Sequence, residues 1–282
     1  MSSLLQKSLP ALVAALAMSG TAQAAIVTVP QSSLVASTGY YTNNLGANIV
    51  TTGGGNGSNV GRLDGRNDDG FQGEVNLGFD YTLFGTTYNS LYINNNGSVS
   101  FGAGVAAYDP SGPTGQDSPI ISPFFSDVDT RNPLSGVVHY QLDTAGQLVV
   151  TWDQVAAYNT RGDVFNSFQL VLRGDNFTTP EGEGQIGFFY KTMDWQASDT
   201  GANLAAVGFG DGAGNGQVLQ GSTGQLNLND AVENHHIWFD ANLVVVPPGG
   251  AVPEPSTWAM MVLGLGGVGA LMRRRRMAFA AA

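Results

Sequence analysis

The middle of the chain alternates apolar residues with small or polar residues at a period of two, which is the spacing of a strand with one buried face. Residues 77–83 read Leu-Gly-Phe-Asp-Tyr-Thr-Leu, and residues 167–173 place Phe168, Leu170 and Leu172 on one side. Between the two ends of the chain, no segment shows a convincing apolar period of 3.6 residues. The pattern therefore predicts strands rather than helices for the body of the protein.

Turn-forming residues separate these strands, and Asn94-Asn95-Asn96-Gly97 is the clearest such turn because Asn and Gly tolerate positive φ. No internal repeat of about 20–50 residues is visible, which argues against a propeller or a solenoid. Short strands with turns between them favour a mainly β fold, an antiparallel β-sandwich-like domain. The other predicted strands are 88–93, 98–101, 136–140, 147–153, 185–191, 204–209 and 237–246.

Residues 1–24 have the order of a signal peptide. A weakly basic start with Lys7 is followed by an apolar run over 9–18 and by Ala22-Gln23-Ala24, the small-x-small pattern that signal peptidases cut. We expect a signal helix here and cleavage after Ala24. A buried N-terminal helix is the alternative, but the order of basic, apolar and small residues favours export.

The C-terminal end has a second targeting pattern. A Pro/Gly linker over 246–257 contains Val252-Pro253-Glu254-Pro255 and precedes an apolar run over 258–272. Arg273, Arg274, Arg275 and Arg276 follow at once. A helix over this run would be about 22 Å long, which is short for a membrane span of about 20 residues. We predict a short transmembrane helix within 258–282, with the arginines as a membrane stop on the cytoplasmic side.

Pro253-Glu254-Pro255, a short apolar helix and an arginine cluster together resemble the PEP-CTERM sorting signal of Gram-negative bacteria. The resemblance implies recognition by an exosortase, a membrane protease that cuts near the Pro-Glu-Pro motif. It implies transient anchoring in the inner membrane with the domain on the periplasmic side, followed by transfer to the cell surface or beyond. The residues 277–282 after the arginines extend further than is usual in the family, and a plain anchor helix is the alternative.

Charge and cysteine content narrow the possible functions. The chain of 282 residues has 11 Lys and Arg, 22 Asp and Glu, and no Cys. Five of the basic residues but only one acidic residue lie outside 25–252, so the exported part is strongly acidic. Such a surface repels nucleic acid and anionic headgroups and attracts cations such as calcium. The absence of cysteine excludes disulfides, thiolate zinc sites and cysteine nucleophiles.

Several ordered blocks between about Ile120 and Asp240 resemble the nidogen-like extracellular domain, NIDO. They include residues 120–131, 136–140, 152–155, 166–172, 186–190, 193–195 and 206–209, and residues 91–97 fit the strand and turn that precede them in bacterial members. Animal members often have Trp where Phe125 stands. The resemblance implies an extracellular β-rich module associated with matrix and adhesion proteins, without catalytic residues.

Five aspartates are candidate calcium ligands. Asp127 and Asp129 would share one face of a strand, and Asp64, Asp68 and Asp69 lie close together earlier in the chain. Carboxylate oxygens are ligands that calcium prefers. Neither stretch has the spaced D-x-D-x-D-G pattern of a calcium loop. The alternative is that Asp129 pairs with Arg131 or accepts hydrogen bonds from turn amides.

Other motifs carry little chemistry. Arg161-Gly162-Asp163 and the G-x-G-x-x-G match at 182–187 both read as turns between strands. His235 and His236 would point to opposite faces of a strand, which suits joint metal binding badly. The sequence contains no G-x-S-x-G and no H-E-x-x-H motif, so nucleophilic and zinc-dependent hydrolysis are poorly supported.

The sequence thus divides into a signal peptide (1–24), a Gly/Ser/Asn-rich segment (25–76), a nidogen-like β domain (77–245), a linker (246–257) and a sorting tail (258–282). We predict a non-enzymatic cell-surface or extracellular-matrix protein, associated with biofilm or exopolysaccharide, whose partners are an exosortase-like protease and a matrix component. A calcium-dependent glycan-binding module is the first alternative. A secreted glycosidase with a carboxylate pair is the second.

Overall fold

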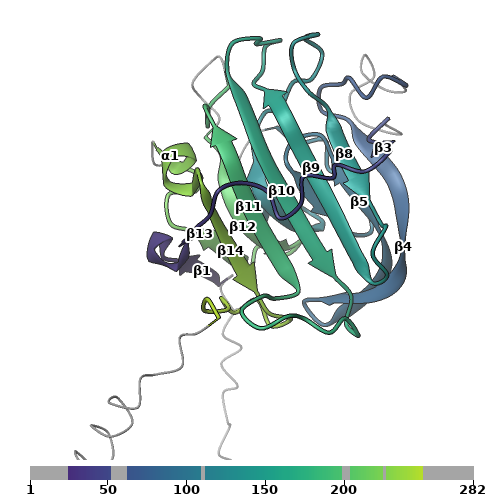
Figure 1. The fold of residues 1–282 in the computed structure, drawn as a ribbon, viewed down its shortest axis with the longest axis vertical. Helices are drawn as coiled ribbons and strands as arrows, with labels where there is room; N and C mark the ends of the chain where they lie inside the picture. Colours follow the sequence, from purple (N-terminus) through teal and green to yellow (C-terminus); the bar gives the residue numbers. More distant parts are fainter. Residues whose placement is uncertain (1–24, 52–61, 109–111, 199–203, 225–226, 250–282) are drawn as a thin grey trace, which may run out of the picture.

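The computed structural model describes residues 25–51, 62–108, 112–198, 204–224 and 227–249. Within these residues, two seven-stranded sheets pack face to face (Figure 1), so the predicted β-sandwich is confirmed. The predicted signal helix and transmembrane helix lie outside the described residues. No helix in the part of the chain that the structure describes is both long enough and apolar enough to cross a membrane.

The neighbouring strands of both sheets run antiparallel, except for the parallel pair β1 and β13. The first sheet has the order β1 (Ile26–Val29), β13 (Gly216–Leu219), β12 (Ala206–Asp211), β7 (Pro119–Phe125), β6 (Ser98–Ser100), β5 (Thr86–Asn94) and β4 (Phe71–Leu83). The second has the order β2 (Val35–Ala36), β14 (His235–Phe239), β11 (Ile186–Met193), β10 (Phe165–Arg173), β9 (Gln147–Ala156), β8 (Val138–Gln141) and β3 (Asn48–Ile49). The helical elements of the described chain are one turn or little more: η1 (Gln31–Ser33), η2 (Pro113–Gly115) and α1 (Leu228–Val232).

Aromatic side chains join the two sheets at their inner faces. The rings of Trp152 on β9 and Phe168 on β10 stack with centroids 5.1 Å apart, and Phe124 on β7 lies 5.6 Å from Phe168. All three are fully buried. Large aromatic rings bury the most apolar area per residue, so this contact between sheets is a main source of the sandwich's stability.

The segment expected to precede the domain is part of it. Strands β1, β2 and β3 add to the edges of the two sheets, and the boundary expected at residue 77 falls inside β4. Residues 37–47 cross the outer face of the second sheet, where Thr42 exchanges two hydrogen bonds with the Gln169 side chain (Figure 1). We call residues 37–47 the strap. Strands of two to four residues show too little periodicity to be predicted from sequence.

Strands β9 and β10 define two ends of the sandwich. At one end Phe165 pairs with Ala156, and at the other Arg173 pairs with Gln147. The last strand, β14, pairs its Phe239 with Ile186 at the Arg173 end, and the chain then leads into the linker. We call this the tail-side end and the opposite one the far end; they lie at the bottom and the top of Figure 1. The nine residues of β10 separate them by about 27 Å.

Candidate functional site: an acidic cluster at the far end

Three aspartates from two distant segments meet at the far end. Asp68 and Asp69 come just before β4, and Asp127 follows β7. One carboxylate oxygen from each of these residues lies within 4.8 Å of the others. β4 and β7 are in the same sheet, with β5 and β6 between them. Because the neighbouring strands are antiparallel, the start of β4 and the end of β7 lie at the same end of that sheet. We call Asp68, Asp69 and Asp127 the acidic cluster.

The acidic cluster is buried. The exposed fractions are 6% for Asp68, 7% for Asp69 and 4% for Asp127. Burial, reinforced by the neighbouring carboxylates, raises the pKa of Asp68 to about 7, and the same causes raise the pKa of Asp127 to about 7. Desolvation and like charges both disfavour the ionised form, so protons compete for these oxygens near neutral pH.

Asp129 has a different environment from the acidic cluster. Its Oδ1 accepts from Arg131 Nε at 2.8 Å, and its Oδ2 accepts from Arg131 Nη2 at 2.5 Å. The backbone N–H groups of Arg131 and Thr160 donate to the same carboxylate. Pairing with Arg131 and with turn amides is the alternative to calcium binding that the sequence offered for Asp129. Arg131 Nη2 also lies 2.8 Å from Asp68 Oδ2, so one guanidinium contacts both carboxylates.

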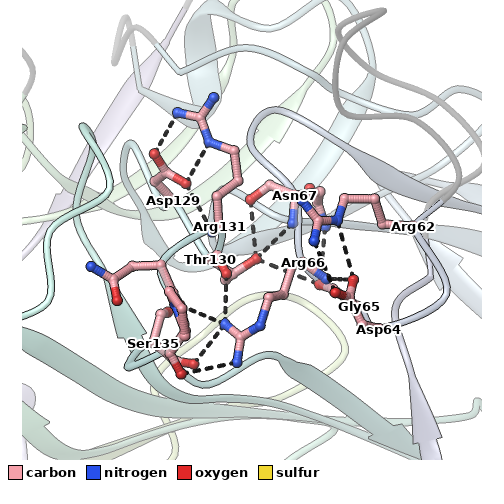
Figure 2. A network of polar contacts seen from close by, with 11 residues as sticks. Arg62, Asp64, Gly65, Arg66, Asn67, Asp129, Thr130, Arg131 and Ser135 are labelled. Atoms are coloured by element: carbon pink, nitrogen blue, oxygen red, sulfur yellow. Dashed lines mark hydrogen bonds and ion pairs between the residues drawn. The ribbon is translucent and has the colours of Figure 1, made fainter.

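Asp64 lies at the surface, apart from the acidic cluster. Arg62 Nη2 donates to its Oδ2 at 2.9 Å, and both side chains are about half exposed. Figure 2 shows this pair beside the polar network around Arg66. Of the five aspartates predicted as ligands, the structure therefore brings three together in the acidic cluster. Asp129 instead forms two hydrogen bonds with the Arg131 side chain, and Asp64 lies at the surface.

A polar network holds the two acid-bearing segments together (Figure 2). Arg66 Nη1 donates to the carbonyl oxygens of Thr130, Asn132 and Ser135 at 2.8, 2.6 and 2.9 Å. Asn67 N donates to Thr130 Oγ1 at 2.9 Å, and Thr130 N donates to Asn67 O at 3.0 Å. A single arginine thus orders the loop after β7. Sequence reasoning missed Arg66, because nothing in its neighbours indicates that it binds main-chain carbonyls.

The turn between β5 and β6 supports the acidic cluster from the side. Asn96 Nδ2 donates to Asp69 Oδ1 at 2.9 Å, and Asn96 Oδ1 accepts from Val128 N at 3.0 Å. Asn95 Nδ2 donates to Val128 O at 2.5 Å. Both asparagines are buried, although a turn is normally exposed. The sequence predicted the turn, and the structure adds that its side chains position Asp69 and the Asp127 segment.

The other motifs occupy structural positions. Arg161 and Asp163 form an ion pair in the loop between β9 and β10, and Gly182 and Gly184 lie in the connection from β10 to β11, with a turn at 181–182, so both turn interpretations are confirmed. His236 stacks on Phe189 with ring centroids 5.2 Å apart, while His235 Nδ1 lies 2.7 Å from Glu233 O. The predicted cleavage residues Ala22 and Ala24, the Val252–Pro255 motif and the arginine stop lie outside the described residues.

A separate open groove lies toward the tail-side end. It has a volume of about 830 Å³. Two half-buried rings, Phe79 and Phe177, line it together with the exposed amides of Asn76, Asn89 and Asn176. Among the described residues that line this groove, Asp80 is the one carboxylate. Aromatic surface with a few polar groups around it is the usual lining of a binding site.

Two family models match adjoining parts of this chain. The model of the NIDO related family matches residues 33–244, which is most of the chain. This range includes every described strand from β2 to β14. The chain belongs to the NIDO-related family. A second family model, the PEP-CTERM protein-sorting motif, matches residues 251–276. The NIDO-related domain and the sorting motif therefore adjoin with only a few residues between them.

Relatives of this NIDO-related chain include alpha-tectorin of Mus musculus, at 30% identity over 169 residues. Nidogen-2 of Mus musculus is 28% identical over 146 residues, and dendrite extension defective protein 1 of Caenorhabditis elegans is 27% identical over 156 residues. The matches cover 51%, 40% and 46% of this chain but only 8%, 10% and 13% of those proteins. No solved structure matches. Together with the sorting motif, these matches support an exported protein of the matrix type.

Proposed function

We propose that this chain is a non-enzymatic matrix module, displayed outside the cell by a tail that an exosortase-like protease processes. The observation that carries the proposal is the order of the two family matches. A NIDO-related domain over 33–244 is followed directly by a PEP-CTERM motif over 251–276. The domain supplies the surface that meets the matrix, and the tail supplies transient attachment to the inner membrane and then release.

The fold suits such display. The last described residues, up to Gly249, leave from the tail-side end, while the acidic cluster lies at the far end. A domain attached through its tail-side end therefore presents the far end away from the membrane. Its acidic surface also disfavours contact with anionic headgroups, which agrees with a domain held off the membrane.

Sorting can be tested by following a C-terminal epitope in producing cells with and without the exosortase-like protease. We expect the extracellular chain to lack the epitope when the protease is present. Without the protease, we expect the full-length chain to accumulate several-fold in the inner-membrane fraction. Glu254→Ala within the Pro-Glu-Pro motif should reproduce this retention, because cutting is directed by that motif.

Pro247→Ala is the matched control, since it changes the same linker outside the motif. It should leave processing unchanged. If the epitope stays attached to the extracellular chain in both strains, the processing proposal fails.

The groove gives the matrix partner a place to bind, and we propose an extracellular polysaccharide as that partner. The two phenyl rings offer flat apolar faces to sugar rings, and the three amides offer donors and acceptors to hydroxyl groups. Since polysaccharides are largely uncharged or acidic, a groove with one carboxylate limits repulsion.

Binding to exopolysaccharide purified from the producing cells can be measured by co-sedimentation. Phe79→Ala combined with Asn176→Ala should weaken binding at least about tenfold, which corresponds to about 1.4 kcal/mol. Tyr108→Ala removes an aromatic side chain that is 49% exposed and does not line the groove, so it should bind normally. An equal loss of polysaccharide affinity in the double variant and in Tyr108→Ala, with both circular dichroism spectra unchanged, would refute the groove as the binding site.

A further inference from the structure

We infer that the acidic cluster is a binding site for one divalent cation, calcium, held by Asp68, Asp69 and Asp127 at the far end of the sandwich. This inference does not depend on the sorting or the polysaccharide proposals. It rests on the spacing of the carboxylate oxygens, on buried oxygens that lack partners, and on the local charge.

The spacing fits a single calcium ion. Calcium binds oxygen at about 2.4 Å, so two ligands of one ion are at most about 4.8 Å apart. The oxygens of Asp68, Asp69 and Asp127 satisfy this limit pairwise without any movement of the backbone. Asp127 follows Asp69 by 58 positions and Asp68 by 59, so folding brings the site together.

Unpartnered oxygens give an independent reason for a ligand. Asp68 is 6% exposed, and within the described chain its Oδ1 has no hydrogen-bond partner, although its Oδ2 contacts Arg131. A buried oxygen of this kind costs free energy unless something pairs with it. Because Oδ2 is already occupied by Arg131, Oδ1 is the atom that remains for a cation.

A second unpartnered oxygen belongs to the turn between β5 and β6. Asn95 is fully buried, and its Oδ1 has no hydrogen-bond partner among the residues described. The N–H of Asn95 donates to Gly70 O, next to Asp69, and its Nδ2 donates to Val128 O, next to Asp127. Asn95 therefore bonds to both acid-bearing segments, through its backbone to one and through its side chain to the other. Amide oxygens are common additional ligands of calcium.

The charge balance also calls for a cation. Asp68, Asp69, Asp127 and Asp129 are all less than one-tenth exposed, and Arg131 is the cation paired with two of them. One guanidinium cannot neutralise four buried carboxylates. A calcium ion would place two further positive charges beside these carboxylates.

The donor set selects among metals. The cluster offers carboxylate oxygens and no imidazole or thiolate, which favours calcium or magnesium over zinc and copper. Magnesium requires a near-ideal octahedron with bonds of about 2.1 Å and keeps several waters. A buried site shaped by three side chains and a polar network suits the looser coordination of calcium better.

Calcium binding can be measured by titration calorimetry of the purified full chain in detergent, after treatment with EDTA. We expect one calcium per chain with a Kd of about 10⁻⁵ to 10⁻³ M, which extends from the weakest sensor sites to the extracellular modules. A calcium concentration of 100 Kd should raise Tm by about 5–10 °C. Magnesium at the same concentration should give a markedly smaller rise.

The variants Asp127→Asn and Asp69→Asn should each weaken calcium binding at least about tenfold. Asn tolerates the positive φ of 62° at position 69. Asp64→Asn is the matched control, because it removes the same charge from the same loop at an exposed position outside the acidic cluster. The inference would be overturned if calcium gave neither heat nor a Tm shift with the unmodified chain. It would also be overturned if Asp64→Asn lost as much calcium affinity as Asp127→Asn and Asp69→Asn.

Discussion

Replacing Gly97 by alanine is expected to cost at least about 4 kcal/mol of folding free energy, enough to leave little folded protein. A Cβ at this position would lie 1.8 Å from the carbonyl oxygen of Phe124, and the residue has a φ of 78°. The colliding atom is backbone of the neighbouring strand, which cannot move away alone. Urea unfolding followed by circular dichroism, together with soluble yield, measures the effect.

Gly102→Ala separates the collision from backbone strain. Gly102 has nearly the same φ, 80°, but a Cβ there meets no atom within 4 Å. It should therefore cost only about 1–2 kcal/mol, the penalty for a left-handed conformation. Similar losses for the two variants would show that the close approach at Gly97 is not what the fold depends on. Asn96 and Asn95 precede Gly97, so a displaced turn also releases their hydrogen bonds to Asp69 and Val128.

Period-two alternation predicted the central strands well. The runs at 77–83, 147–153 and 167–173 lie within β4, β9 and β10, and the turn at 94–97 joins β5 to β6. Each of these strands meets the opposite sheet with one face, so its apolar residues must alternate. The same pattern did not predict strand β7, Pro119–Phe125, most of which falls in a block that resembles NIDO. From Ile120 on its residues are buried on both faces, so apolar side chains follow one another in Ile120-Ile121 and Phe124-Phe125 instead of alternating.

The acidic cluster was predicted only as a set of candidates. Asp68, Asp69 and Asp127 were among five aspartates that the sequence could not sort. Sorting requires knowing that the loop before β4 and the loop after β7 meet, which depends on strand order rather than on local pattern. The local spacing of the aspartates also suggested a pairing that the structure does not have. Asp127 and Asp129 share a face in an ideal strand, but β7 ends at Phe125, and the two side chains have different partners.

The outer face of the second sheet was the least predictable part of the fold. Ser167, Gln169 and Arg173 alternate with the core residues of β10 and would normally face water. The strap covers them instead, with Tyr41 packed in a small apolar group against the sheet. A polar segment rich in Ser, Thr and Asn gives no hydrophobic pattern that would indicate such packing. One result is a fully buried arginine, Arg173.

Arg173→Met is expected to destabilise the fold by about 3–5 kcal/mol, the usual cost of removing one partner from a buried ionic network. Arg173 Nε donates to Gln147 Oε1 at 2.9 Å, Nη1 donates to Gly184 O at 3.0 Å, and Nη2 donates to Tyr41 OH at 3.1 Å. Its guanidinium also pairs with Glu183. Methionine fills similar volume but donates no hydrogen bond, so these acceptors would lose their partner.

The aromatic surroundings increase the expected loss. The guanidinium carbon lies 4.5 Å from the ring centroid of Trp238 and 4.9 Å from that of Phe177, and cation–π contacts of this kind are strongest away from water. Thermal unfolding should show a Tm lower by roughly 10 °C. Arg62→Met removes an exposed arginine from a surface ion pair and should cost less than about 1 kcal/mol. A loss of folding free energy as small as that in Arg173→Met would mean that the contact between Arg173 and Tyr41 of the strap does not stabilise the fold.

Arg173 also affects the groove, because the ring of Phe177, which it contacts, lines the groove. Arg173→Met should therefore weaken polysaccharide binding even in the folded fraction, whereas Arg62→Met should leave that binding unchanged.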